Sequence, residues 1–162
     1  KTAKVGAVRS WCTRECSFNA PRRTQSFAWR GTMITKEAIQ AIGLPRQEYF
    51  LYADDVEYAL RLARRGFAIY WVPASKVVEN RFKAGIYPEK ARLYYAFRNQ
   101  VHLGFCYREW WFLIRTLLYA LKVLSIISFS GAASRKERMR AVMDGVGDGF
   151  KAKLGRNQAY NL

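Results

Sequence analysis

The chain has 162 residues, of which 51% are hydrophobic and 15% aromatic, and this composition is too apolar for a disordered protein. Lys and Arg number 28 against 12 Asp and Glu, so the formal net charge is +16 and predicts an anionic partner: nucleic acid, a membrane surface or a phosphorylated substrate. With only three cysteines, an odd number, a disulfide scaffold is not expected and a reducing, cytosolic setting is favoured.

The first part of the chain mixes predicted strands and helices. A short helix is expected over Lys36–Ile42, with Thr35 as its N-cap. A second helix is expected from Asp54 to Arg65, because apolar residues recur at helical spacing and its acidic start and basic end match the helix dipole. Strands are predicted at Val5–Val8, Phe67–Val72 and Lys76–Val78.

The last part of the chain is predicted to be helical, over Glu89–Tyr107, Trp110–Phe129 and Ser134–Leu154. The second of these helices is long enough to cross a bilayer, but Arg115 and Lys122 would each cost about 2.5–3.5 kcal/mol near its centre. We therefore expect it to lie in the membrane interface, with the basic stretch Arg135–Arg140 adding attraction to anionic lipid. A helix buried against the rest of the protein is the alternative.

An acidic cluster formed by Asp54, Asp55 and Glu57 stands out, because these are three of the twelve acidic residues of a strongly cationic chain. Carboxylates at a helix N-terminus are stabilised by about 0.3–1 kcal/mol, so helix capping is one interpretation. The other is that one carboxylate is a general base that deprotonates an incoming hydroxyl, while a second one orients it.

The sequence ADDVEYALRLARRG at Ala53–Gly66, followed by an apolar strand that ends in Val72-Pro73, resembles the family 2 glycosyltransferases of the GT-A fold, and in particular the bacterial galactofuranosyl- and rhamnosyltransferases. Segments 31–44, 94–99 and 144–156 are similar to flanking parts of that family in the same order. The resemblance implies an α/β fold. Residues 1–87 would be the acceptor-side, C-terminal half of a Rossmann-like GT-A domain, and residues 88–162 a helical, membrane-associating segment.

In this family the second acidic residue of the pair is the catalytic base of an inverting sugar transfer. The resemblance therefore implies that Asp55 activates the acceptor hydroxyl, with Asp54 and Glu57 as acceptor-binding neighbours. Asp-x-Asp, the motif with which the family holds a divalent cation against the donor diphosphate, does not occur in the chain. We therefore expect Mg²⁺ or Mn²⁺ to be bound mostly by residues outside this chain, in a nucleotide-binding half that precedes Lys1.

Five further residues are candidates, four of them by the same resemblance and Arg98 because its planar guanidinium suits a phosphate. Trp29, Arg30 and Gly31 match the segment that lines the donor and acceptor cleft, although Trp29 could equally be a core residue. Arg98 could contact a phosphate, and an ion pair within the fold is the alternative. Glu79 takes the place of a metal-binding His in many members; a carboxylate is an acceptable Mg²⁺ ligand, and a solvated surface Glu is the alternative.

These features predict an inverting, metal-dependent glycosyltransferase part that moves a hexosyl residue from a nucleotide-sugar donor to a hydroxyl of a cell-envelope glycan or of a polyprenyl-diphosphate-linked saccharide. The expected location is the cytoplasmic face of the cell membrane, as a peripheral protein on an anionic surface. One alternative is a basic nucleic-acid-binding module, but no nucleic-acid motif is found, so such a partner is not expected. Another is a scaffold that has lost catalysis.

Overall fold

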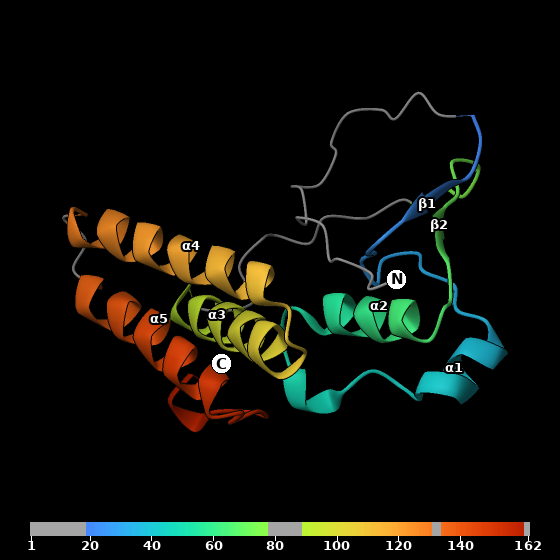
Figure 1. Cartoon of the computed structure of the whole chain (residues 1–162). Helices are drawn as coiled ribbons and strands as arrows, with labels where there is room; N and C mark the ends of the chain where they lie inside the picture. The colour runs from blue at the N-terminus through green and yellow to red at the C-terminus, as the bar shows by residue number, and fades with distance from the viewer. Residues whose placement is uncertain (1–18, 78–88, 131–133, 161–162) are drawn as a thin grey trace. The chain divides into compact units, whose positions relative to one another are not determined.

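The computed structural model of the chain describes residues 19–77, 89–130 and 134–160. The elements are β1 (Arg22–Thr24), α1 (Lys36–Ile42), the 3₁₀ helix η1 (Gln47–Tyr49), α2 (Asp54–Arg64), β2 (Ile69–Trp71), α3 (Glu89–Cys106), α4 (Trp110–Ser128), α5 (Arg135–Phe150) and the 3₁₀ helix η2 (Gln158–Tyr160) (Figure 1). They form two compact units. Within the described residues, the first unit contains 19–45 and 55–77, and the second contains 46–54, 89–130 and 134–160.

The expected α/β fold is wrong. In the part of the chain that the structure describes, the one sheet is the pair β1 and β2, which run antiparallel with Arg22 opposite Trp71 and Thr24 opposite Ile69. A Rossmann-like GT-A domain needs several parallel strands joined by helical crossovers, and this short antiparallel pair is no part of such a sheet. Helices dominate the described residues instead. The strand predicted at Val5–Val8 lies outside these residues, and Lys76 and Val77 form no strand.

The first unit is built around α1 and α2. The predicted cap of α1 is confirmed, because the Thr35 hydroxyl oxygen accepts a hydrogen bond of 3.2 Å from the backbone N–H of Ala38. Residues 26–35 are rich in aromatic and β-branched side chains but form no strand, because the chain turns between Trp29 and Thr32, where Gly31 has a φ of 70°. Ala38, Tyr58 and Leu62 are buried in this unit, and the partly buried residues packed against them are Phe27, Trp29, Ile34, Ile42, Phe67 and Ile69.

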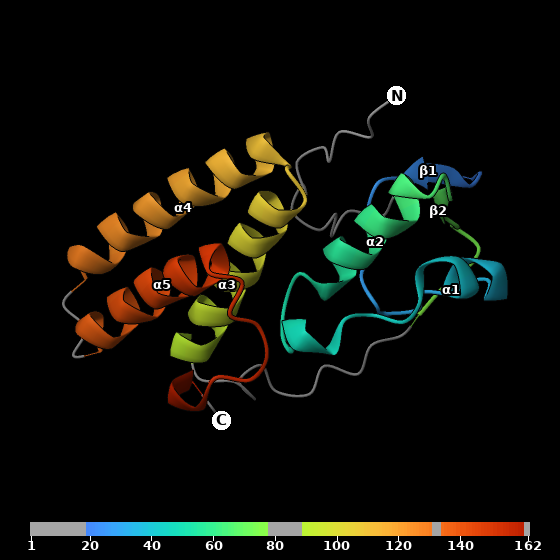
Figure 2. The same cartoon turned by 60° about the horizontal axis from the view of Figure 1, so that its bottom comes forward.

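The second unit is a bundle of three helices, α3, α4 and α5, each packed on the other two, as Figures 1 and 2 show from two directions. All three were predicted within a few residues of their bounds, apart from the last turn of α5, and only residues 107–109 join α3 to α4. One buried cluster, formed by Phe97, Ala120, Ile127 and Val142, joins all three helices. A second, formed by Ala91, Tyr94, Tyr95, Ala141 and Tyr160, holds the C-terminal residues on α3 and α5.

Two glycines let α5 approach α3 closely. A Cβ atom added at Gly145 would lie 2.6 Å from the backbone oxygen of Tyr94, and one added at Gly149 would lie 2.6 Å from the backbone oxygen of Arg98. Backbone atoms cannot move aside as the end of a flexible side chain can. The absence of a side chain at these positions therefore sets the distance between the two helices.

We expect Gly145→Ala to lower the free energy of unfolding by about 1–3 kcal/mol, because the added methyl group overpacks the contact with α3. Gly147 is a matched control in the same helix, since a Cβ added there meets nothing within 4 Å. Gly147→Ala should raise stability by about 0.5–1 kcal/mol through its better helix propensity. Urea denaturation followed by circular dichroism at 222 nm measures both changes, and equal effects at the two positions would contradict the close-approach argument.

Candidate functional site

The segment that leads into the acidic cluster is held on α3 by a buried asparagine. The side-chain amide nitrogen of Asn99, which is fully buried, lies 2.8 Å from the carbonyl oxygen of Tyr49, 2.7 Å from that of Leu51 and 2.8 Å from that of Tyr52. The two N–H groups of this amide are thus shared among three carbonyl groups that no helix or sheet pairs. The path of the chain from η1 to α2 depends on it.

Arg98 holds the same segment from beside Asn99. Its guanidinium donates to the carbonyl oxygens of Tyr49 at 3.0 Å and Glu48 at 3.2 Å, and it also donates to the carbonyl oxygen of Gly155. It lies over the ring of Tyr95, 4.8 Å from the ring centroid, and is fully buried. Among the described residues, Arg98 forms no ion pair with a carboxylate, and its enclosed guanidinium is bonded to backbone carbonyl groups instead. Its role is to position the segment before α2.

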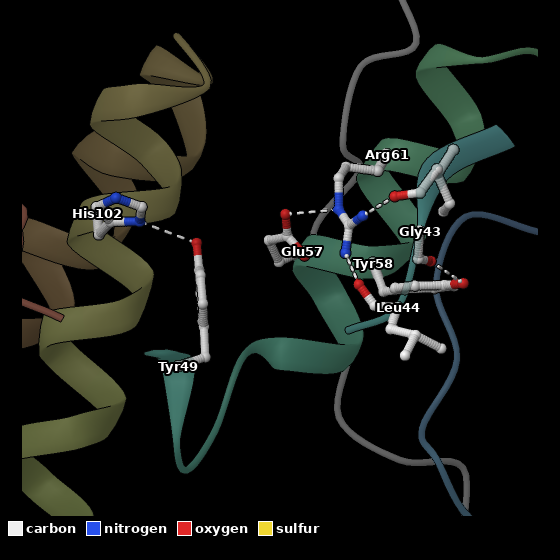
Figure 3. A network of polar contacts seen from close by, with 8 residues as sticks. Gly43, Leu44, Tyr49, Glu57, Tyr58, Arg61 and His102 are labelled. Atoms are coloured by element: carbon white, nitrogen blue, oxygen red, sulfur yellow. Dashed lines mark hydrogen bonds and ion pairs between the residues drawn. The ribbon is translucent and has the colours of Figure 1, made fainter. Parts of the chain in front are cut away.

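A third residue of α3, His102, completes this anchoring. Its Nδ1 lies 2.9 Å from the hydroxyl oxygen of Tyr49, and both side chains are buried (Figure 3). The two rings also meet edge to face, with centroids 5.6 Å apart. His102 is therefore a core residue that fixes Tyr49 in η1.

The anchored segment has a strained backbone. Phe50, Tyr52 and Ala53 have φ angles of 58°, 67° and 62°, in the left-handed region that residues other than glycine rarely adopt. Each such residue costs on the order of 1–3 kcal/mol and persists only where the surroundings impose it. Here Arg98 and Asn99 impose it, and strain of this kind is typical of functional sites.

The acidic residues follow directly. Asp54 begins α2 and is half-buried. Asp55 is half-buried too, and its Oδ1 accepts a hydrogen bond of 2.8 Å from the backbone N–H of Val56. Glu57 differs from both, because it is fully buried and its Oε1 lies 2.8 Å from Nε of Arg61 (Figure 3).

The pair of Glu57 and Arg61 is structural. Arg61 also donates to the carbonyl oxygens of Ile42 and, at 3.0 Å, of Leu44, and so holds the chain that leaves α1. The expected role of Glu57 as an acceptor-binding residue is therefore corrected: its carboxylate keeps this arginine in place. The candidates for proton transfer that reach the surface are Asp54 and Asp55.

Trp29, Arg30 and Gly31, which were predicted to line a cleft, are considered in turn. Trp29 packs in the core of the first unit, with its ring centroid 5.1 Å from that of Phe27 and 5.3 Å from that of Tyr58, so the core alternative holds. Arg30 is exposed. Gly31 has a φ of 70°, and a Cβ atom added there would lie 2.3 Å from a methyl carbon of Val77. The conformation of this turn and the contact with Val77 therefore account for a glycine at this position.

A groove of 310 Å³ opens in the second unit beside the strained segment. It is lined by Tyr52, Glu89, Arg92, Leu93, Ala96, Phe97, Gln100, Tyr119 and Val123. Aromatic rings and a few polar side chains of this kind suit a sugar, whose ring has apolar faces and a rim of hydroxyl groups. The sequence did not predict this groove or the anchoring role of Asn99. The one available signal was the polar pair Arg98-Asn99, which follows the apolar residues 94–97 of the helix.

The aspartates of α5 hold the end of the chain. The hydroxyl of Tyr160 donates to Asp144 at 2.6 Å, and that of Tyr94 donates to Asp148 at 2.7 Å and accepts from the side chain of Asn157 at 2.9 Å. Burial, reinforced at Tyr160 by the bond to Asp144, raises the pKa of both phenols above the usual value of 10. These aspartates are structural residues.

The described residues were also searched for a cluster of side chains that could bind a metal ion. Residues 19–77, 89–130 and 134–160 contain no group of three His, Cys, Asp or Glu side chains that could hold an ion. Glu79, the candidate ligand, lies outside the described residues.

Comparison of the chain with protein-family models, with curated proteins and with solved structures finds no match. Function must therefore be inferred from the residues themselves.

Proposed function

We propose that this chain is the acceptor-side part of an inverting glycosyltransferase related to family 2, and that it transfers a hexosyl residue to a hydroxyl of a cell-envelope glycan or lipid-linked saccharide. The observation that carries the proposal is the strained segment that Arg98 and Asn99 hold and that ends at Asp54-Asp55. A single Asp side chain can cap a helix without backbone strain and without buried polar residues such as Arg98, Asn99 and His102. Helix capping therefore does not account for the strained and anchored segment.

The reaction is a single displacement. Asp55 takes the proton of the acceptor hydroxyl while that oxygen forms a bond to the anomeric carbon of the donor, and the bond from that carbon to the nucleoside diphosphate breaks with its electron pair on the leaving oxygen. The nucleotide sugar and the Mg²⁺ or Mn²⁺ that neutralises its diphosphate belong, in this proposal, to residues outside this sequence.

The groove beside Tyr52 supports a saccharide as acceptor. Tyr52 and Tyr119 offer aromatic faces for a sugar ring, and Arg92 and Gln100 offer donors for its hydroxyl groups. Tyr52 also belongs to the anchored segment, two positions before Asp54.

Saturation-transfer NMR of the chain with methyl galactofuranoside and methyl rhamnoside tests the acceptor site. We expect signal on the sugar-ring protons, and a several-fold weaker signal for Tyr52→Ala and for Gln100→Ala, each of which removes one side of the groove. Tyr70→Ala is the matched control, because Tyr70 is an exposed tyrosine on β2 in the first unit and is not one of the residues that line the groove. Equal signals for all variants would contradict the proposal, and binding of a single-stranded oligonucleotide alone would favour the nucleic-acid alternative.

A further inference from the structure

One face of α4 carries large apolar side chains that the structure leaves exposed. Trp111 is 68% exposed, Leu118 60% and Leu121 63%, and Phe129 just after the helix is 90% exposed. With Ile114 they recur at a spacing of three and four residues, so they share one side of the helix. The opposite side is buried at Leu113, Thr116, Ala120 and Ile127. An apolar face of this size on a charged protein marks an interaction site.

Cations border this apolar face. Arg115 and Lys122 are exposed and lie seven residues apart, on one edge of it. Arg135 donates a hydrogen bond of 3.3 Å to the carbonyl oxygen of Ser128, which places a third cation at the end of the helix beside Phe129. The whole chain carries a formal charge of +16. Apolar side chains rimmed by cations complement an anionic lipid surface.

The packing of α4 argues against a membrane-spanning helix. By length and composition, α4 is the one helix among the described residues that could cross a membrane. However, its buried face packs on α3 and α5, so a spanning α4 would carry these helices with it. α3 buries Arg98, Asn99 and His102, and α5 exposes Lys136 and Arg140, all of which are expensive in hydrocarbon.

We propose that α4 docks the protein on an anionic phospholipid bilayer. The helix lies parallel to the surface, with Trp111, Leu118 and Leu121 in the interfacial layer and with Arg115 and Lys122 against lipid phosphates. A second copy of the chain is the weaker occupant, because two bodies of charge +16 repel each other whereas anionic lipid attracts both.

Docking would bring the groove to the headgroup layer, because Tyr119 and Val123 of α4 line it. A lipid-linked acceptor would then meet the groove without leaving the membrane. This consequence rests on the proposed function, whereas the docking itself does not.

Flotation of the 162-residue chain with lipid vesicles tests the docking. We expect binding to vesicles of equal parts phosphatidylcholine and phosphatidylglycerol, and about tenfold less binding to phosphatidylcholine alone. The double variant Leu118→Glu, Leu121→Glu should lose binding about tenfold, and Arg115→Glu, Lys122→Glu should lose the preference for anionic lipid. Met33→Glu is the control, because Met33 is 90% exposed but lies in the other unit. Circular dichroism checks that each variant is folded.

Two further measurements separate the outcomes. Tryptophan emission should shift to the blue when anionic vesicles are added, and Trp111→Phe should reduce this shift. Light scattering after gel filtration reports self-association. No flotation, or flotation that survives the two glutamates on α4, would overturn the proposal. A dimer that these glutamates dissociate, without vesicle binding, would assign the face to a second copy. Since flotation needs no sugar, its result is independent of the result for sugar transfer.

Discussion

Replacing Asp55 by Asn is expected to lower the rate of hexosyl transfer by about 10²–10⁴-fold, which is the contribution of a positioned general base. The fold should survive, because the amide oxygen of Asn can still accept the hydrogen bond that Asp55 receives from the backbone N–H of Val56 at 2.8 Å. The substitution therefore removes the proton acceptor and keeps this hydrogen bond in the first turn of α2. The measurement is release of nucleoside diphosphate, in a protein that contains this sequence together with the donor-binding part that the proposal requires.

Two controls distinguish catalysis from helix capping. Glu37 stands in the first turn of α1 and is exposed, so Glu37→Gln removes a comparable carboxylate from another helix and should leave turnover unchanged. Asp54→Asn should have a smaller effect than Asp55→Asn if Asp54 only orients the acceptor. If Asp55→Asn retains full turnover and changes stability by no more than about 1 kcal/mol, capping is its whole role and the proposed base is refuted.

Replacing Arg98 by Ala is expected to cost about 3 kcal/mol or more of unfolding free energy, because it removes the guanidinium hydrogen bonds to the carbonyl groups of Glu48, Tyr49 and Gly155 and leaves a cavity where a fully buried side chain stood. For a chain of this size the melting temperature should fall by roughly 6–12 °C. Arg98→Lys should be nearly as damaging, because a single ammonium group cannot reach carbonyls on different sides as the planar guanidinium does. Thermal melting followed by circular dichroism measures both variants.

Arg92 is the control for this experiment. It lies on the same helix but is exposed, so Arg92→Ala should change stability by less than about 0.5 kcal/mol. An Arg98→Ala protein as stable as the original would contradict the positioning role. Full stability combined with lost acceptor binding would instead return Arg98 to the substrate-binding residues.

Local sequence signals predicted the helices well. Thr35 before Lys36–Ile42 predicted a capped helix, and the acidic start and basic end of α2 predicted its bounds within a residue. Helix formation depends on residues three and four positions apart, and these are present in any stretch of the sequence. The same reasoning located α3 and α4 and the start of α5.

The sheet could not be predicted in the same way. Residues 26–35 have the composition of a strand, but a strand needs a partner for its backbone, and here the chain turns at Gly31 and no strand pairs with it among the described residues. The strand that does pair with β2 is Arg22–Thr24, which is polar and carries no apolar alternation. The resemblance to a GT-A enzyme therefore suggested a parallel sheet that the described residues do not form.

The sequence by itself determined the helices, the strong positive charge, the acidic start of α2 and the apolar length of α4, because each of these is a property of neighbouring residues. Only the tertiary structure decided which polar residues are buried. Glu57 and Asp55 are two positions apart, yet one is enclosed with Arg61 and the other is only half-buried. Arg98 serves backbone carbonyls some fifty residues away in sequence. Burial and such distant partners follow from how helices pack, which no local pattern encodes.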